Sequence, residues 1–552
     1  MVKEHFTIAN PLRLISISIA LSFSFPNFAQ AATSHLNCSE LLKFPIQNGK
    51  IISAQSVGAG NSKPDPYRMF TGANANVVKL PKHCVVKGLI DERKGADGKD
   101  YAIRFEVRLP DNWQQRFMFQ GGGGTDGFLA NSIGTIPVLG STAEPALSRG
   151  YAVASMNGGH DGTGPLFGLD QKARIDYAYA AIGKVTIQAK RVIEHYYQNK
   201  EKFSYFMGCS NGGREAMISA QRYPNEFDGV VAGNPGFRLS KAALGEVWDL
   251  QTLYKITPKD KSGEKILANA LTDEDLNLVS NSILKQCDAL DGVTDGIVND
   301  YLNCDFSPEV LLCSTDRQSN CLSEEKVSAI TSIFNGAKDS RGNQVYSSWP
   351  YDAGINSQGW RMWKLGNSQD PNKPDALSAV LGSDSLKYYF MTPPQPTFDL
   401  LQFDFDEDVS KVYETGALND ASSTYMNSFA NKGGKLLIFQ GVSDPVFSAN
   451  DIVDWYNQTG ANTSGGNMDD LRQWNRLFMV PGMAHCGGGP ALDNFDPLTA
   501  IQNWVEEGQM PTYLKATGQA FPNKSQPICS YPETAHYNGK GDINSSNSYY
   551  CK

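Results

Sequence analysis

The stretch that decides the fold is Phe203-Ser-Tyr-Phe-Met-Gly-Cys-Ser-Asn-Gly-Gly-Arg-Glu-Ala216. Its first five residues predict a buried strand, and residues 214–223 predict the helix that follows. Between them, Gly208-Cys-Ser-Asn-Gly212 fits the pattern Gly-x-Ser-x-Gly, in which a tight strand-to-helix turn needs small flanking residues and projects the serine hydroxyl outward. We therefore expect Ser210 to be a catalytic nucleophile. The alternative is an ordinary turn in which Ser210 only caps the helix.

Further apolar runs on both sides of this stretch have the length of buried strands. They cover residues 116–120, 151–156, 229–232, 435–439 and 476–480, and helical spacing covers residues 173–197 and 497–507. Strands that alternate with helices predict an α/β fold with a mostly parallel sheet. Together with the serine motif at a strand-to-helix turn, this pattern is typical of an α/β-hydrolase core.

A serine nucleophile requires a base and an acid that orients the base. His485 follows the run 476–480 and Asp444 follows the run 435–439, which gives the hydrolase chain order Ser, Asp, His. The alternative for Asp444 is a turn residue before a proline. His160 also follows a strand, and we expect it to be structural.

The developing oxyanion needs two backbone N–H donors. We expect them from Asn211, which follows the nucleophile, and from Gly124, at the end of the Gly121–Gly124 run. A phosphate-binding loop is the alternative for this run, but the Gly-Lys-Ser/Thr ending of such loops is missing.

The composition of the 552 residues excludes several classes of protein. Aromatic residues make up 11% and charged residues 19%, which argues against disorder. The net charge of −9 argues against a nucleic-acid partner. Residues 1–31 combine Lys3, Arg13, a short apolar run and Ala29-Gln-Ala31, the pattern of a signal peptide. No later stretch approaches the ~20 apolar residues of a membrane span. We expect a secreted or periplasmic protein with no membrane partner, whose ten cysteines are free to form disulfides.

The alternation of strands and helices fails between residues 237 and 430. This segment holds four tryptophans and four cysteines among many Gly, Ser, Asn and Asp residues, which indicates a folded insertion rather than a linker. We therefore divide the chain into a core part at residues 32–236, an inserted lid domain at residues 237–430, and a second core part at residues 431–552.

An acidic, turn-rich segment lies inside this insertion. Asp288, Asp291 and Asp295 offer hard oxygen ligands at short spacing, and Gly292 and Gly296 permit tight turns. The spacing is not that of an EF-hand, so the residues alone leave open a metal site or a solvated acidic turn.

Four motifs resemble those of the tannase/feruloyl esterase family of α/β-hydrolases. They are residues 208–216, 287–297, 481–486 and 541–544, and the resemblance extends from Cys38 to Cys551. It is greatest to the bacterial branch of the family that hydrolyses mono(2-hydroxyethyl) terephthalate. The resemblance implies a serine carboxylesterase that acts on small esters of aromatic acids. We expect the enzyme to be a monomer. Feruloyl esterase or tannase action on plant phenolic esters is the alternative. A non-catalytic, calcium-dependent polyphenol-binding protein and a peptidase are more remote ones.

The same resemblance implies a metal and a set of disulfides. A structural Ca²⁺ is bound by the carboxylates of Asp288, Asp291 and Asp295 and by the carbonyls of Val293 and Ile297. The implied disulfides are Cys38–Cys84, Cys209–Cys486, Cys287–Cys304, Cys313–Cys321 and Cys529–Cys551.

The substrate pocket is also inferred from the resemblance. It places Trp363 and Phe447 against the aromatic acyl group, with ordinary core packing as the alternative. One departure concerns an arginine of that bacterial branch, which pairs with the free carboxylate of its substrate. Counted without gaps, its position here is Leu377, and a nearby phenylalanine becomes Leu381. Either another group binds the carboxylate, or the preferred ester is uncharged.

Overall fold

The computed structural model describes residues 35–314 and 319–552, so the predicted signal peptide at residues 1–31 lies outside the described residues. A nine-stranded sheet with the order β1-β4-β5-β7-β6-β8-β9-β10-β11 forms its centre. The six strands from β7 to β11 in this order pair in parallel. They are β7 (Tyr151–Met156), β6 (Arg116–Gln120), β8 (Phe203–Cys209), β9 (Gly229–Gly233), β10 (Lys435–Gly441) and β11 (Asn475–Val480). These are the six strands that the apolar runs predict, and the α/β-hydrolase fold class is confirmed.

Three antiparallel strands extend one edge of the sheet, and the sequence analysis did not predict them. They are β1 (Gly49–Val57), β4 (His83–Lys94) and β5 (Asp100–Pro110). In β1 and in the second half of β4, buried positions are interrupted by exposed polar ones. A strand at the sheet edge faces solvent on one side, so it lacks the continuous apolar run of a parallel strand.

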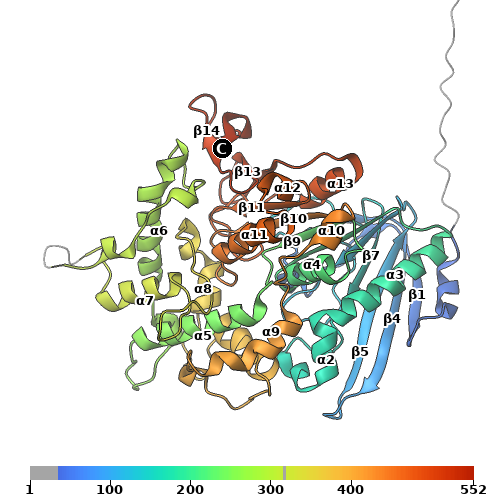
Figure 1. The fold of residues 1–552 in the computed structure, drawn as a ribbon, viewed down its shortest axis with the longest axis horizontal. Coiled ribbons are helices and arrows are strands. Elements are labelled where there is room, and N and C mark those ends of the chain that lie inside the picture. The colour runs from blue at the N-terminus through green and yellow to red at the C-terminus, as the bar shows by residue number, and fades with distance from the viewer. Residues whose placement is uncertain (1–34, 315–318) are drawn as a thin grey trace, which may run out of the picture.

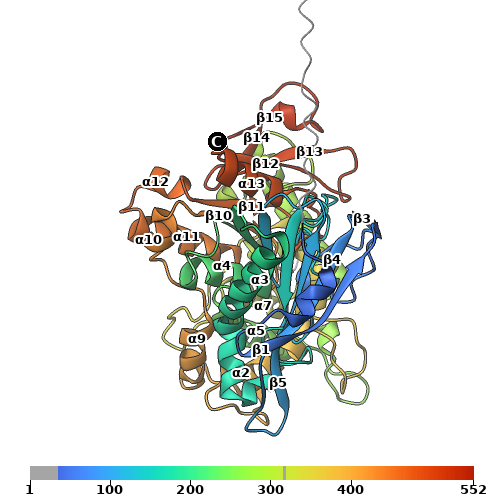
Figure 2. The same ribbon diagram turned by 90° about the vertical axis from the view of Figure 1, so that its right-hand side faces the viewer.

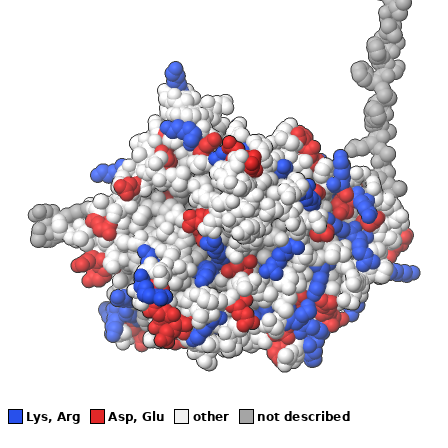
Figure 3. All heavy atoms as spheres, viewed as in Figure 1, with Lys and Arg blue, Asp and Glu red and all other residues white. Residues whose placement is uncertain are grey.

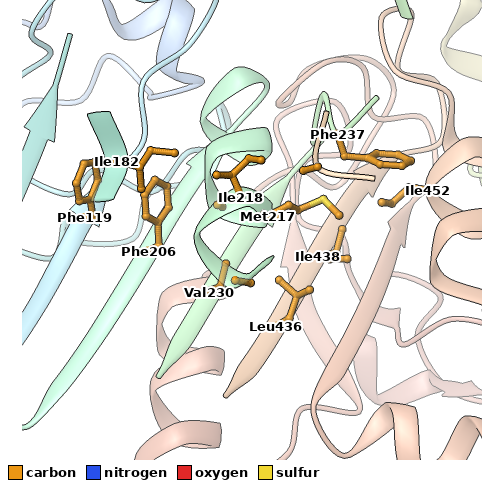
Figure 4. Packing of buried hydrophobic residues seen from close by; sticks show 14 of the residues in the cluster. Phe119, Ile182, Phe206, Met217, Ile218, Val230, Phe237, Leu436, Ile438 and Ile452 are labelled. Atoms are coloured by element: carbon orange, nitrogen blue, oxygen red, sulfur yellow. The ribbon is translucent and has the colours of Figure 1, made fainter. Parts of the chain in front are cut away.

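Helices cover both faces of the parallel strands. On one face lie α3 (Ala181–Tyr197), α4 (Asn211–Arg222) and α11 (Ala449–Thr463), and on the other lies α13 (Pro497–Glu507). Figure 4 shows Ile182 and Ile218 on the first face above Phe119 and Phe206, all of which are fully buried. Each such side chain contributes about 1.5–3 kcal/mol to folding. The core therefore fixes the carboxyl ends of the strands, where the predicted site residues lie.

The insertion between β9 and β10 is helical rather than irregular. Its longer helices are α5 (Leu239–Ile256), α6 (Asp273–Cys287), α7 (Glu324–Phe334), α8 (Gln358–Lys364) and α9 (Tyr413–Asn419). Figure 1 shows α5 to α8 on one side of the sheet, away from β1, β4 and β5. The backbone N–H of Ala421 donates to the carbonyl of Phe237 at 2.7 Å, and Ser240 Oγ donates to the Asp420 carboxylate at 2.6 Å. The segment thus leaves the core and returns to it at one point.

The C-terminal part adds two small sheets, β12 (Tyr513–Thr517) with β13 (Ser525–Cys529) and β14 (Ala535–Tyr537) with β15 (Tyr549–Cys551). Figure 2 shows them gathered at one end of the molecule. The remaining short elements are α1 (Arg68–Thr71), α2 (Gln171–Ile175), α10 (Asn427–Asn431), α12 (Met468–Arg472), β2 (Gly60–Asn61) and β3 (Lys79–Leu80).

Five disulfides cross-link the structure, and their pairs are the five that the family resemblance implies. Basic and acidic side chains are intermixed on the face shown in Figure 3. Within residues 35–314 and 319–552, no helix has both the length and the apolar character that crossing a bilayer requires.

Candidate active site

Ser210 lies at the turn between β8 and α4 in a rare backbone conformation, with φ 63° and ψ −125°. Its side chain makes no capping hydrogen bond to the helix, so the alternative role as a helix cap is not observed. The turn is tight on both sides of the serine. A Cβ at Gly208 would lie 2.5 Å from the carbonyl oxygen of Gly212, and a Cβ at Gly212 would lie 2.6 Å from the carbonyl oxygen of Gly122. Glycine is required at both positions because α4 lies this close to β8 at Gly208 and to the Gly121–Gly124 run at Gly212.

Three predicted residues form one hydrogen-bonded chain at the carboxyl ends of the strands. Ser210 Oγ lies 2.9 Å from His485 Nε2. His485 Nδ1 lies 3.0 Å from Asp444 Oδ2 and 3.2 Å from Asp444 Oδ1. The Asp444 side chain is fully buried, whereas the His485 side chain keeps 12% of its surface exposed. In this arrangement the carboxylate orients the imidazole, and the imidazole faces the serine hydroxyl.

The Asp444 carboxylate also accepts hydrogen bonds from groups that the sequence analysis did not name. The side-chain amides of Asn234 and Gln440 donate to Oδ2 at 2.7 and 3.2 Å, and the backbone N–H of Val446 donates to Oδ1 at 2.8 Å. Hydrogen bonds of this kind stabilise the ionised carboxylate. Asn234 directly follows β9, so its position at a strand end was the available signal.

Gly124 and Asn211, the predicted oxyanion donors, both line the pocket that contains Ser210. Asn211 is the first residue of α4, and the N–H groups of a first helical turn have no partner within the helix. The Tyr177 hydroxyl lies 3.1 Å from the carbonyl oxygen of Gly124 and 3.2 Å from Asn211 Oδ1. Tyr177 therefore joins the two segments that supply the donors.

Asp126 and Glu215 form a pair of buried carboxyl groups next to the Gly121–Gly124 run. The sequence analysis did not predict this pair. Gly122 N–H donates to Glu215 Oε2 at 2.9 Å, and Asn211 Nδ2 donates to Asp126 Oδ1 at 2.5 Å. Burial, reinforced by the adjacent Glu215 carboxyl, raises the pKa of Asp126 well above its usual range. The raised pKa favours the protonated form of Asp126, which lessens the repulsion between the two carboxyl groups as they brace the loop.

The pocket beside Ser210 encloses about 580 Å³ of empty space, open mouth included. Trp363, Phe447 and Leu381 line it, as predicted, but Leu377 is not among its lining residues. The rings of Trp363 and Phe447 lie edge-on to the His485 ring, with centroids 5.6 and 5.3 Å away. The other lining residues are Gly124, Thr125, Tyr177, Ser210, Asn211, Leu239, Ala242, Ala243, Glu246, Gly382, Ser385, Tyr389, Phe390 and Val446.

His160 does not line this pocket. Its ring stacks on Phe167 with a centroid distance of 3.8 Å, and burial lowers its pKa to about 3. It is therefore a neutral core residue, in agreement with the structural role we expect for it.

The acidic segment of the insertion closes into a loop after α6. The Asp288 carboxylate accepts hydrogen bonds from the N–H groups of Asp295 and Gly296 at 3.1 and 2.9 Å. Asp295 Oδ2 pairs with Lys524 Nζ at 2.6 Å. Burial, together with the neighbouring carboxylates, raises the pKa of Asp291 to about 6. Across the described ranges, no three acidic, histidine or cysteine side chains converge closely enough to hold a metal ion.

Comparison with known proteins agrees with this geometry. Residues 84–552 match the family described as "Tannase and feruloyl esterase". The chain belongs to this family. It is 37% identical over 534 residues to the mono(2-hydroxyethyl) terephthalate hydrolase of Piscinibacter sakaiensis, with 88% of this chain and 87% of that protein covered. It is 26% identical to a probable feruloyl esterase B-2 of Aspergillus flavus, with 91% of each covered.

Solved structures of the tannase and feruloyl esterase family share the fold. Feruloyl esterase B from Aspergillus oryzae matches with a TM-score of 0.77 and 24% identity, over 93% of this chain and 100% of that one. Tannin acyl hydrolase from Aspergillus niger matches with a TM-score of 0.70 and 20% identity, over 93% and 94%. The predicted family is confirmed, and the protein is a carboxylic ester hydrolase.

Proposed function

We propose that this protein is a secreted or periplasmic serine esterase that hydrolyses esters of aromatic acids through Ser210, His485 and Asp444. The observation that carries the proposal is the 2.9 Å contact between Ser210 Oγ and His485 Nε2 beside a pocket lined by Trp363 and Phe447. Flat apolar rings of this kind suit an aromatic acyl group.

The mechanism follows from the chain of contacts. His485 Nε2 accepts the hydroxyl proton as Ser210 Oγ attacks the ester carbonyl, and Asp444 stabilises the imidazolium that forms. The N–H groups of Gly124 and Asn211 bind the oxyanion. His485 then protonates the leaving alcohol, and a water molecule activated by the same imidazole hydrolyses the acyl-enzyme.

The acyl group is the finer part of the proposal. Similarity to the Piscinibacter enzyme supports a monoester such as mono(2-hydroxyethyl) terephthalate, which would yield terephthalate and ethylene glycol. A second candidate, a phenolic ester such as a ferulate or gallate, is favoured by the pocket itself. Among the described residues that line the pocket, none is Lys or Arg, and Glu246 is the only charged type. A free carboxylate thus has no cationic partner at the pocket wall.

A structural Ca²⁺ at the acidic loop is part of the proposal. The donors are carboxylate and carbonyl oxygens, which Ca²⁺ prefers. Asp295 pairs with Lys524, and Asp288 and Asp291 belong to the same loop, so a divalent ion would balance the negative charge of the three carboxyl groups. When bound, the ion would crosslink the loop whose ends Cys287 and Cys304 already join. Five disulfides support an oxidising compartment, and we propose a monomer with no nucleic-acid partner.

The test is hydrolysis by the wild type and by Ser210→Ala. We expect the variant to lose at least 10³-fold in kcat on a chromogenic aromatic ester, because among the described residues Ser210 is the one nucleophile hydrogen-bonded to His485 Nε2. Retained turnover would overturn the assignment of Ser210. A serine-directed phosphonate inhibitor separates an esterase from a non-catalytic binding protein, and an aromatic amide substrate separates it from a peptidase. Values of kcat/KM for the terephthalate monoester, its neutral diester, methyl ferulate and methyl gallate then rank the acyl groups.

A further inference from the structure

One carboxyl group faces the acyl pocket. Glu246 lies on α5 and lines the pocket together with Ser210, although its side chain is only 5% exposed. Its Oε1 lies 3.3 Å from Lys364 Nζ. Its Oε2 is buried and has no hydrogen-bond partner in the described part of the chain. A buried carboxyl oxygen without a partner is costly, so a ligand group that satisfies it gains affinity.

Glu246 shares its cation with a second carboxylate. Lys364 Nζ lies 2.5 Å from Asp249 Oδ2, and the side chains of Lys364 and Asp249 are 1% and 2% exposed. Two buried carboxyl groups therefore face one ammonium. Burial raises the pKa of Glu246 to about 8, with added repulsion from Asp249 and Asp444 and an opposing effect of Lys364. A pKa of about 8 favours the neutral carboxylic acid form of Glu246 at neutral pH, while Lys364 keeps its closer contact with Asp249.

Most other polar side chains of the pocket wall are already hydrogen-bonded within the protein. Thr125 Oγ1 donates to the Thr163 carbonyl at 2.7 Å, and the Tyr389 hydroxyl donates to Asn419 Oδ1 at 3.1 Å. The Tyr177 hydroxyl joins Gly124 and Asn211, as described above. Among the described lining residues, three polar side-chain groups remain outside the catalytic chain: the Glu246 carboxyl, the Ser385 hydroxyl and the Trp363 indole N–H. Of these, Glu246 is the one with a buried, unpartnered oxygen.

We propose that Glu246 is a specificity-determining residue that hydrogen-bonds a hydroxyl group on the aromatic ring of the acyl moiety. This role favours the phenolic esters named above over the terephthalate monoester, and it rests on the proposed esterase function. A neutral carboxyl donates to a ring hydroxyl, and an ionised carboxylate accepts from it, so the pairing holds in both states of Glu246. A free carboxylate on the ring could pair only with the neutral state and would be repelled by the ionised one.

The geometry also indicates which variants fold. Removing the Glu246 carboxyl leaves Lys364 paired with Asp249 and packed over the Trp349 ring at 4.9 Å, so no buried charge loses its partner. Glu246→Met fills similar volume without a hydrogen-bonding group. Glu246→Gln keeps both a donor and an acceptor. Ser385→Ala is the matched control, since it removes a hydroxyl group of the pocket wall and leaves the Glu246 carboxyl in place.

The experiment measures kcat/KM for methyl benzoate, methyl 3-hydroxybenzoate and methyl 4-hydroxybenzoate with the wild type and the three variants. For each enzyme, the readout is the ratio of the better hydroxybenzoate to benzoate, so a general loss of activity cancels. We expect a ratio of at least ten for the wild type, a fall of at least tenfold in Glu246→Met, and largely preserved ratios in Glu246→Gln and Ser385→Ala. A site built to hydrogen-bond a substrate hydroxyl discriminates strongly against the analogue that lacks it.

Each outcome decides between the proposals. A Glu246→Met enzyme with a normal thermal melt and an unchanged ratio overturns the role of Glu246, as does a ratio lost in Ser385→Ala. If Glu246→Met does not fold, the wild-type ratio decides alone, because no preference for either hydroxybenzoate overturns the proposal. Hydrolysis of methyl benzoate without a hydroxyl preference leaves the esterase function standing, whereas hydrolysis of none of the aromatic esters refutes that function itself.

Discussion

The disulfide between Cys209 and Cys486 joins the two loops that carry Ser210 and His485. Each cysteine is the direct neighbour of a residue in the hydrogen-bonded chain. We predict that replacing both cysteines by alanine lowers stability and activity together. The cross-link closes a loop of 277 residues in sequence, which corresponds to roughly 5–6 kcal/mol in the chain-entropy account of disulfides. With an unfolding entropy of about 1 kcal/mol per kelvin for a chain of this length, Tm should fall by about 5 °C.

Activity should fall more than this loss of stability explains. Without the cross-link, Ser210 Oγ and His485 Nε2 are held together by their 2.9 Å contact, by the Asp444 carboxylate that orients the imidazole, and by the packing of the two loops. A misplacement of about 1 Å in a catalytic pair costs on the order of 10²-fold in rate. We therefore expect kcat on a chromogenic aromatic ester to fall at least tenfold at a temperature well below Tm, where the variant is fully folded.

The matched control is the double alanine variant of Cys529 and Cys551. In the wild type, this disulfide links the two small C-terminal sheets. Its loop spans 22 residues, so we expect a Tm loss of about 3 °C and an unchanged kcat. Differential scanning calorimetry and steady-state kinetics measure both quantities. A kcat within twofold of the wild type in the Cys209/Cys486 variant would refute the claim that this disulfide positions the catalytic loops. Equal Tm losses in both variants would refute the loop-length argument.

Three further predictions concern the turn, the acidic loop and the pocket carboxyl. Gly208→Ala should reduce kcat at least a hundredfold, because its Cβ would lie 2.5 Å from the Gly212 carbonyl oxygen; Gly58→Ala, whose Cβ meets nothing within 4 Å, should keep wild-type activity. Chelation of calcium should lower Tm by several degrees and added Ca²⁺ should restore it, whereas a Tm indifferent to both would contradict the calcium proposal. Glu246→Gln should raise Tm relative to the wild type more at pH 8.5 than at pH 5.5. The folded wild type holds a proton up to a pKa of about 8 that the unfolded chain releases above 4.5, so raising the pH through this window destabilises only the wild type. A difference that stays constant with pH would show that Glu246 ionises as freely in the folded protein as in the unfolded chain.

The parallel strands could be predicted because their burial produces a simple pattern in the sequence. Strands such as β10 are buried on both faces, so they appear as continuous apolar runs that end where the site residues begin. The edge strand β1 faces solvent on one side, and its mixed pattern is easily taken for a loop. The helices of the insertion were missed for a related reason, since several are short and separated by Gly- and Asp-rich connections.

The hydrogen-bonded chain of Ser210, His485 and Asp444 could be predicted from chain order, but the pocket could not. Ser210, Asp444 and His485 each follow a strand, and parallel strands bring their carboxyl ends together. Much of the pocket wall comes from α5, α8 and the π-helical segments Ser378–Gly382 and Ser385–Phe390, and no local rule places these elements against the sheet. Counting without gaps predicted that Leu377 lies in the pocket. In this segment, the first residue after Trp363 that lines the pocket is Leu381, four residues after Leu377. Glu246 did leave a signal, as the only carboxylate in the apolar run 242–248.

The hydrogen bond between Ala421 and Phe237 has an evolutionary consequence. Because the helical insertion starts and ends at this one hydrogen bond, its length and sequence can change while β9 and β10 remain paired. Doubling such a loop costs only about 0.6 kcal/mol in closure entropy. The proposed nucleophile, base and acid follow strands of the sheet, and most of the residues that line the pocket belong to the insertion. The insertion can thus be exchanged as a unit. Grafting it between relatives is a direct route to transferring ester preference without rebuilding the catalytic centre.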